Sequence, residues 1–262
     1  MVRCVSLSPV SPILLTFNFG LELLARSPSQ RVLPALVVTL AFGLFGFLLR
    51  GVTKGGAVAG TLTSFAIYLG LGLGGFVTLA GVFAITLLTT RLGYYRKLQL
   101  GLAESSTGRT AGQVFANLSA AAVFAVLAIK AQLFALAAVA AIAEAAADTA
   151  QSEIGEIVSH RSWLITSFRQ VPAGTDGGIT FPGSLAGAVA VCTIVALAAV
   201  THVIAPNRTW IAGIAGFFGT IVDSLLGATF ERRGWLNNNG VNFLSTLASG
   251  ATAIAISLFV HQ

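Results

Sequence analysis

The acidic residues of this chain are few and unevenly placed. Nine Asp and Glu residues occur among 262 residues, and five of them fall within residues 144–178. Long apolar segments flank this stretch, and a charged side chain at the centre of a bilayer costs roughly 2.5–3.5 kcal/mol. Residues 144–178 are therefore the first candidate for a functional site.

Asp148 and Asp223 lie in similar local patterns. The first belongs to Asp148-Thr-x-x-Ser and the second to Asp223-Ser-x-x-Gly. If each lies near the end of a helix at the same membrane face, the two carboxylates could hold Mg²⁺, which takes one or two carboxylates together with substrate phosphates. We predict Asp148 and Asp223 as metal ligands, with Glu153 as a third.

Ion pairing is the alternative interpretation of these carboxylates. Glu144 and Asp148 are four residues apart, so they share one face of a helix, and Ser152 continues that face. Any of these acids could simply pair with an arginine of a neighbouring loop. For Glu144, Glu153 and Glu231 the two interpretations stay open.

Basic residues near the ends of the apolar segments could neutralise phosphate groups. Lys54 lies at an expected helix N-terminus, where free N–H groups and the helix dipole favour an anion. Arg91, Arg96 and Lys97 follow one apolar segment, and Arg109 precedes the next. Such charge runs most often determine topology, but on the carboxylate face they would also bind phosphate. We predict anion-binding roles for Lys54, Arg91, Lys97 and Arg109.

Residues 171–178 form a glycine-rich segment, VPAGTDGG, between two expected helices. Gly and Asp tolerate unusual backbone angles, so the segment could be a plain turn. Its length and its position facing basic loops favour a lid or a nucleotide contact. We predict such contacts for Asp176, Gly177 and Gly178, with the charge of Arg169 nearby.

Two amides, Asn117 and Asn242, lie inside apolar segments. An amide in such a helix usually hydrogen-bonds to a neighbouring helix, which is the leading alternative to substrate binding. Residues 237–240, Asn-Asn-Asn-Gly, indicate a turn and an N-cap before the last helix.

The composition is that of an integral membrane protein. The chain is 55% hydrophobic and 9% charged, with a mean hydropathy of +0.87, whereas about a quarter of the residues of a soluble domain are charged. The net charge of +6 comes from basic residues placed mostly between apolar segments. They form no basic stripe with interleaved aromatic residues, so nucleic acid is not an expected partner. The two cysteines are isolated and the three histidines far apart, which argues against a zinc site.

Eight apolar segments are close to the roughly 20 residues that a bilayer crossing needs. We predict a single integral-membrane domain over residues 1–262, an all-α polytopic transmembrane helix bundle of eight helices. Residues 1–30 could add a ninth, lie at the interface or be a cleaved signal peptide. A tight turn is expected at residues 70–75. The expected helices lie near residues 32–49, 57–73, 75–93, 111–129, 131–150, 183–204, 209–230 and 240–260.

The loops between these segments differ in charge. Alternate loops carry ten basic residues in one set and four in the other. The positive-inside rule assigns the richer set to the cytoplasm. The carboxylate motifs and residues 237–242 lie in or beside the same loops, so we predict an active site at the cytoplasmic face.

Four motifs follow one another along the chain. They are Ala147-Asp148-Thr-x-x-Ser-Glu153-Ile-Gly155, Pro172-x-Gly174-Thr175-Asp176-Gly177-Gly178, Val222-Asp223-Ser224-Leu-Leu-Gly227-Ala-Thr and Asn238-x-x-Val241-Asn242. With Gly112-Gln113-Val-x-Ala-Asn117, this order resembles the integral-membrane family that contains plant phytyl-phosphate kinase and vertebrate transmembrane protein 19. The chain departs from that family at residues 237–239, where Asn-Asp is more usual.

The resemblance implies phosphoryl transfer from a nucleoside triphosphate, such as CTP, to an isoprenoid lipid monophosphate, such as phytyl phosphate. It also implies a bacterial-type inner membrane or a plastid or other organelle membrane. On this hypothesis Mg²⁺ joins Asp148 and Asp223 to the nucleotide phosphates, and Lys54 is a further catalytic candidate. The candidate substrate- and nucleotide-binding residues are Arg91, Lys97, Arg109, Asn117, Ser152, Arg169, Asp176, Gly177, Gly178, Ser224, Asn238 and Asn242.

A secondary transporter or lipid scramblase with a carboxylate-lined site is the alternative function. Carboxylates within the membrane and glycine-interrupted helices also occur in secondary transporters. The two functions differ in depth, because a transporter places its polar residues near the membrane midplane, whereas this sequence places them at one face.

Overall fold

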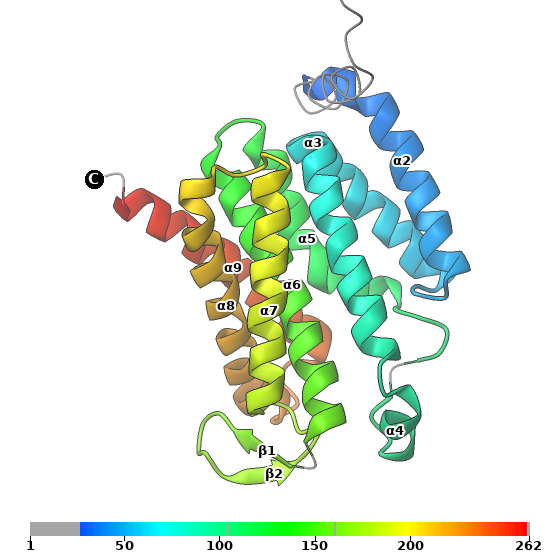
Figure 1. Cartoon of the computed structure of the whole chain (residues 1–262), viewed down its shortest axis with the longest axis vertical. Coiled ribbons are helices and arrows are strands. Elements are labelled where there is room, and N and C mark those ends of the chain that lie inside the picture. Colours follow the sequence, from blue (N-terminus) through cyan, green and yellow to red (C-terminus); the bar gives the residue numbers. More distant parts are fainter. Residues whose placement is uncertain (1–26, 104, 160, 261–262) are drawn as a thin grey trace, which may run out of the picture.

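The computed structural model describes residues 27–103, 105–159 and 161–260. Within these residues, seven helices are long and apolar enough to cross a membrane, which confirms the predicted all-α transmembrane bundle (Figure 1). Of the uncertain segment 1–30, residues 1–26 lie outside the described part. The helices are α2 (Pro28–Leu48), α3 (Lys54–Arg91), α4 (Tyr94–Gln99), α5 (Ala111–Ala128), α6 (Leu133–Val158), α7 (Phe181–Val200), α8 (Thr209–Leu226) and α9 (Asn238–Val260).

Helix α3 replaces two of the eight expected helices. It runs from Lys54 to Arg91 but is interrupted at Gly72, whose φ of 71° and ψ of −163° are not helical. Only glycine adopts such angles readily. The Arg91 guanidinium donates a hydrogen bond to the carbonyl of Leu49, close to the start of α3. Both ends of α3 therefore lie on one side of the bundle, and the turn expected at residues 70–75 is the break at Gly72 between the two helical halves of α3.

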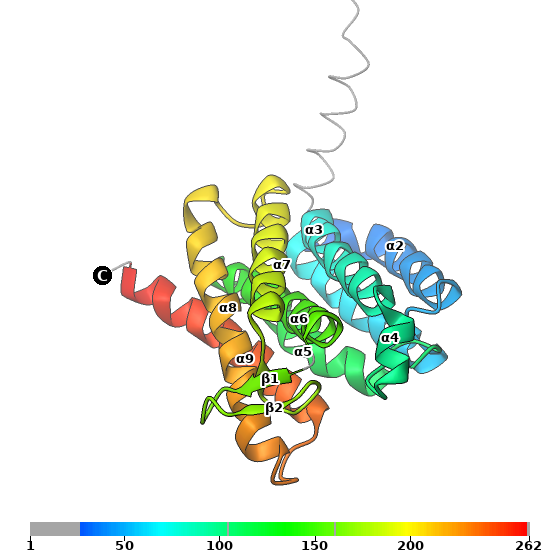
Figure 2. The same ribbon diagram turned by 60° about the horizontal axis from the view of Figure 1, so that its bottom comes forward.

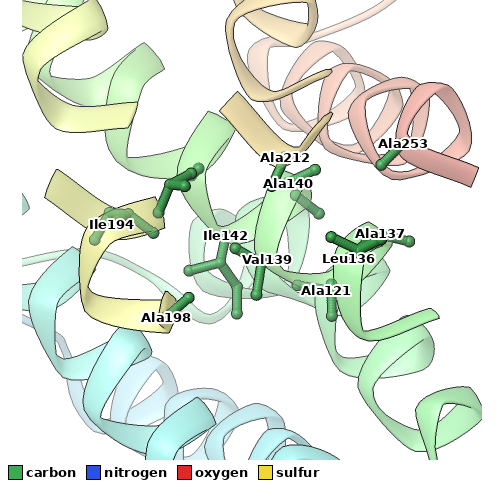
Figure 3. Close-up of a cluster of buried hydrophobic side chains, with 14 of the residues drawn as sticks. Ala121, Leu136, Ala137, Val139, Ala140, Ile142, Ile194, Ala198, Ala212 and Ala253 are labelled. Carbon is green, nitrogen blue, oxygen red and sulfur yellow. The ribbon is translucent and has the colours of Figure 1, made fainter. Parts of the chain in front are cut away.

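Helix α6 is the central element of the bundle. It packs against α3, α5, α7, α8 and α9, and every residue from 135 to 147 is buried. Most of these residues are alanines, and small side chains allow helix backbones to approach closely in a bilayer. Figure 3 shows that this core combines α6 residues with Ile194 and Ala198 of α7 and Ala212 of α8. The packing of this N-terminal half fixes where the polar C-terminal half of α6 lies among its neighbours.

A small antiparallel sheet follows α6 where a loop was expected. Its strands are β1 (Arg161–Leu164), β2 (Gln170–Pro172) and β3 (Gly178–Ile179), in the order β2-β1-β3. Trp163 pairs with Gln170 on one side and Ile179 on the other. The strands are too short for an alternating sequence pattern to reveal them. Figure 2 shows the sheet at the end of the bundle, beside the end of α8.

Helix α8 changes its winding at the same end. Residues Gly227–Glu231 form a π-helical turn, a feature often found at functional sites. A Cβ atom at Gly177, which has a φ of 72°, would lie 2.3 Å from the Ala228 nitrogen. Gly177 therefore permits the loop between β2 and β3 to contact this turn directly.

Candidate functional site

A cavity of about 290 Å³ lies where α5, α6, α8, α9 and the small sheet meet. It is lined mainly by polar side chains and by glycines of the loop between β2 and β3. Eleven of the sequence-predicted site residues come together here: Arg109, Asn117, Asp148, Ser152, Asp176, Gly177, Gly178, Asp223, Ser224, Asn238 and Asn242.

The two aspartates of the sequence motifs face each other across this cavity. Asp148 comes from α6 and Asp223 from α8, and their side chains are close enough to interact directly. Oδ2 of Asp223 is buried and has no hydrogen-bond partner among the described residues. Like charges in this arrangement are costly, and the Arg109 guanidinium offsets part of the charge of Asp148. Two carboxylates against one guanidinium still suit a ligand that brings positive charge.

The wall of the cavity is strongly acidic. Its carboxylates are those of Asp148, Glu156, Asp176, Asp223 and Glu231, whereas Arg109 is its one basic residue in the described part of the chain. A polyanionic ligand would be repelled by this wall. The same ligand would be attracted to the wall when it binds together with cations.

Glu144 lies one helical turn from Asp148, toward the middle of α6. Its side chain is 1% exposed, it interacts with Asp148, Asp223 and Ser245, and its Oε1 has no hydrogen-bond partner among the residues described. It lies outside the lining of the cavity. Glu144 thus extends the acidic cluster from the cavity into the bundle interior.

Arg109 is positioned by a short parallel bridge between two loops. Its N–H donates to the Gly51 carbonyl and its carbonyl accepts from the Thr53 N–H, both at 3.0 Å. Nη2 of Arg109 donates to Oγ1 of Thr149 in α6, at 3.2 Å. A Cβ atom at Gly56 would lie 2.2 Å from the Arg109 carbonyl oxygen. The absence of a side chain at Gly56 is therefore a condition for this placement.

The amides in the apolar helices contact each other and also line the cavity. Nδ2 of Asn242 donates to Oδ1 of Asn117 at 3.3 Å, and Nδ2 of Asn117 donates to the Gln113 carbonyl at 2.8 Å. Oδ1 of Asn242 is buried without a hydrogen-bond partner in the described residues. The hydrogen bond between helices that was considered from the sequence is therefore present, and Oδ1 of Asn242 remains as an acceptor that a ligand could use.

Four of the predicted cations lie outside the cavity wall. Lys97 forms a buried ion pair with Glu153, and Arg91 lines a separate cavity with Arg50 and Arg109. Lys54 and Arg169 are exposed. Lys54, Arg91 and Lys97 lie near helix ends as expected, but charge alone does not reveal which side chains turn toward the cavity.

The structure adds polar residues that the sequence did not single out. Gln151 donates to Oγ of Ser224 at 3.4 Å and lines the cavity with Ser162 and Thr180. Gln151 is three residues from Asp148, so helix periodicity was a usable signal. Ser162 and Thr180 reach the cavity through the small sheet, which the sequence did not predict.

The predicted metal set is not assembled as a group of three. Among the described residues, no cluster of three or more His, Cys, Asp or Glu side chains is placed to hold a metal ion, and Glu153 is engaged by Lys97 and Thr90. Mg²⁺ needs fewer protein ligands, because it keeps waters and binds substrate phosphates. Asp148 and Asp223, with the unpartnered Oδ2, fit that requirement.

Comparisons with known proteins agree on a membrane family. The family model described as integral membrane protein DUF92 matches residues 37–250. Uncharacterized membrane protein MJ0933 of Methanocaldococcus jannaschii is 31% identical over 77% of this chain and 84% of its own length. Protein VTE6, chloroplastic, of Arabidopsis thaliana is 29% identical, over 82% and 68%. Uncharacterized membrane protein sll0875 of Synechocystis sp. is 30% identical, over 72% and 76%. No solved structure matches the chain significantly.

Proposed function

This chain belongs to the DUF92 family of integral membrane proteins, and we propose that it is a membrane kinase for lipid phosphates. It would transfer the γ-phosphoryl group of a nucleoside triphosphate, such as CTP, to an isoprenoid lipid monophosphate, such as phytyl phosphate. The proposal rests on one observation above all, the acidic cavity to which two transmembrane helices contribute Asp148 and Asp223. The similarity of the chain to VTE6 and the resemblance of its motifs to the phytyl-phosphate kinase family support an isoprenoid lipid phosphate as the substrate.

Phosphoryl transfer requires positioning and charge neutralisation more than covalent chemistry by the protein. An oxygen of the lipid phosphate attacks the γ-phosphorus, the bond to the β–γ bridging oxygen breaks, and the nucleoside diphosphate leaves. The attacking oxygen is already ionised, so no strong general base is needed. This suits a cavity lined by carboxylates, amides and hydroxyls, without a Cys or His among the described residues that line it.

Each part of the cavity has a role in this proposal. Asp148 and Asp223 would hold Mg²⁺, which when bound neutralises the phosphate oxygens of the nucleotide. The Arg109 guanidinium would bind phosphate oxygens, and Asn117 and Asn242 would orient the substrates. The loop with Asp176, Gly177 and Gly178 would cover the nucleotide, and the whole chain would act as one domain with its active site at the cytoplasmic face.

One observation favours the transporter as a second candidate. Glu144 is almost fully buried near the middle of α6, and buried carboxyls at that depth occur in ion pathways and proton relays. A transporter would need Glu144 for its function. A kinase whose chemistry takes place at Asp148 and Asp223 would not.

Radiolabel transfer tests the proposal directly. The full chain is reconstituted in liposomes with γ-labelled CTP, ATP, GTP or UTP and a panel of isoprenoid monophosphates. We expect label in a lipid diphosphate, dependence on Mg²⁺, and loss of transfer in Asp148→Asn. Absence of transfer from all four nucleotides to every lipid would reject the kinase.

A further inference from the structure

A second cavity lies directly beside the acidic one. It has a volume of about 90 Å³ and is lined almost entirely by apolar and small residues of α2, α3 and α5. Its wall includes Phe42 and Gly46 of α2, Ala57 and Gly60 of α3, and Leu118 of α5. Away from its boundary with the acidic cavity, such a lining disfavours phosphate or a nucleotide base, because burying an unpaired polar group costs free energy. The lining of this cavity suits a hydrocarbon chain.

The two cavities share part of their walls. Arg109, Gln113 and Asn117 line both of them. A charged guanidinium therefore lies at the boundary between the acidic cavity and the apolar one. A ligand that spans this boundary must carry an anionic end and an apolar chain.

Arg109 retains hydrogen-bonding capacity at this boundary. Nη2 is used by Thr149, whereas Nε is buried and has no hydrogen-bond partner within the described residues. A buried donor without an acceptor is costly, and the planar guanidinium offers several N–H groups that match phosphate oxygens. An anionic headgroup at the boundary would satisfy it.

The apolar cavity also lies on a side of the bundle where lipid is accessible. Helix α2 contributes to its wall, and most residues of α2 are not buried inside the protein. Among them, Leu36, Leu40 and Leu44 are about half exposed. The cavity is smaller than the roughly 300–1,000 Å³ of common ligand pockets, so it can hold only a short segment of a long chain.

We propose that this apolar cavity binds the part of the lipid acceptor's hydrocarbon chain next to its phosphate, and that Arg109 binds the phosphate itself. The remaining carbons extend into the surrounding lipid. The nucleotide then occupies the acidic cavity from the opposite side of Arg109. This inference rests on the proposed function for the identity of the acceptor, but the binding site can be tested without turnover.

Gly60 allows a specific test. A Cβ atom added there meets no described atom within 4 Å, so Gly60→Leu should fill the cavity without displacing the backbone. Gly213 in α8 is a matched control, because it is also a half-buried helical glycine with no described atom within 4 Å of a Cβ. It lines neither cavity. Thermal unfolding of both variants in detergent verifies that they are folded.

The measurement is binding of a C20 isoprenoid monophosphate to the full chain, with the C20 alcohol and inorganic phosphate as probes of the two ends. We expect the monophosphate to bind better than either probe. Gly60→Leu should weaken its binding at least tenfold and leave Mg²⁺–nucleotide binding unchanged, while Gly213→Leu should match the wild type. Wild-type protein that does not bind the monophosphate would overturn the inference, as would equal binding by Gly60→Leu.

The proposed kinase activity and the proposed binding of the lipid's hydrocarbon chain in the apolar cavity can be rejected independently. Lipid binding that depends on Gly60, without any label transfer, would support binding of the hydrocarbon chain in the apolar cavity and reject the kinase activity. Label transfer that is unaffected by Gly60→Leu would support the kinase activity and overturn binding of the hydrocarbon chain in this cavity.

Discussion

The Lys97 ammonium and the Glu153 carboxylate form an ion pair inside the protein, with side-chain exposures of 0% and 5%. Nζ of Lys97 also donates to the carbonyls of Thr90 at 2.9 Å and Thr89 at 3.3 Å. Oγ1 of Thr90 donates to the other carboxylate oxygen at 2.7 Å. An ammonium has three donors, so Lys97 has none left for a phosphate. The pair connects α4 to the end of α3 and to α6.

This ion pair predicts a stability effect rather than a binding effect. Lys97→Met should lower the free energy of unfolding by about 3–5 kcal/mol, because it leaves Glu153 buried and unpaired. Lys97→Met with Glu153→Gln should recover part of that loss. Denaturant unfolding in detergent measures both, and Lys54→Met is the control because Lys54 is exposed. A Lys97→Met variant that is as stable as the wild type but binds nucleotide more weakly would instead show that Lys97 contributes to nucleotide binding.

Asp148 and Asp223 should be essential for turnover but not for folding. Asp148→Asn and Asp223→Asn remove one of two half-buried neighbouring charges, so we expect folded protein with at least a hundredfold lower label transfer. Glu144→Gln is the matched control, because Glu144 is close to both aspartates but lies outside the cavity lining. The kinase should tolerate it within a few-fold. Lost turnover in Glu144→Gln, with activity retained in either Asn variant, would contradict this assignment.

Much of this architecture was accessible from the sequence because hydrophobic length and charge act locally. Apolar segments predicted the helices. The similar local patterns of Asp148 and Asp223, at helix ends on one membrane face, predicted two residues that do share one cavity. The fate of the lysines was not accessible in this way. Whether Lys97 meets a phosphate or Glu153 depends on how the six-residue helix α4 folds back onto α6. The small sheet was missed because it depends on pairing between short segments rather than on their own pattern.

Gly56 should be a position where a single methyl group disturbs the site. In Gly56→Ala the new Cβ would lie 2.2 Å from the Arg109 carbonyl oxygen, which must move and break its hydrogen bond with Thr53. We expect a loss of about 1–3 kcal/mol of stability and a clear fall in lipid-phosphate affinity.

Gly55→Ala provides the comparison, because its Cβ would meet Ala111 at an ordinary 3.5 Å. Both variants gain the same helix propensity, so the difference between their unfolding free energies isolates the clash. Equal stability of the two would show that the bridge at Arg109 is not required.

The positive-inside rule predicts the orientation of the cavity. Single cysteines at Tyr95, Phe168 and Trp235, which are 83%, 69% and 68% exposed, should react with an impermeant maleimide from the cytoplasmic side in a cysteine-free background. A cysteine at Lys130, exposed in the loop between α5 and α6, should react from the other side. Labelling of any two of the first three from the far side would reject a cytoplasmic active site.

The charge of the cavity wall predicts how a nucleotide binds. Five carboxylates and Arg109 line it, so a nucleoside triphosphate alone should be repelled, whereas the Mg²⁺ complex should bind at least tenfold more tightly. Asp148→Asn should remove most of this dependence on Mg²⁺, because it deletes one of the two proposed ligands. Lys54→Gln should change the affinity by no more than about fivefold, since exposed charges contribute roughly 0–1 kcal/mol. Calorimetric titration with CTP, ATP and GTP, with Mg²⁺ and with EDTA, measures each affinity. If no nucleotide binds at millimolar concentration and the protein instead binds H⁺ or Na⁺ together with its substrate, it is a transporter. Its carboxylates would then bind a coupling ion rather than Mg²⁺ and a nucleotide.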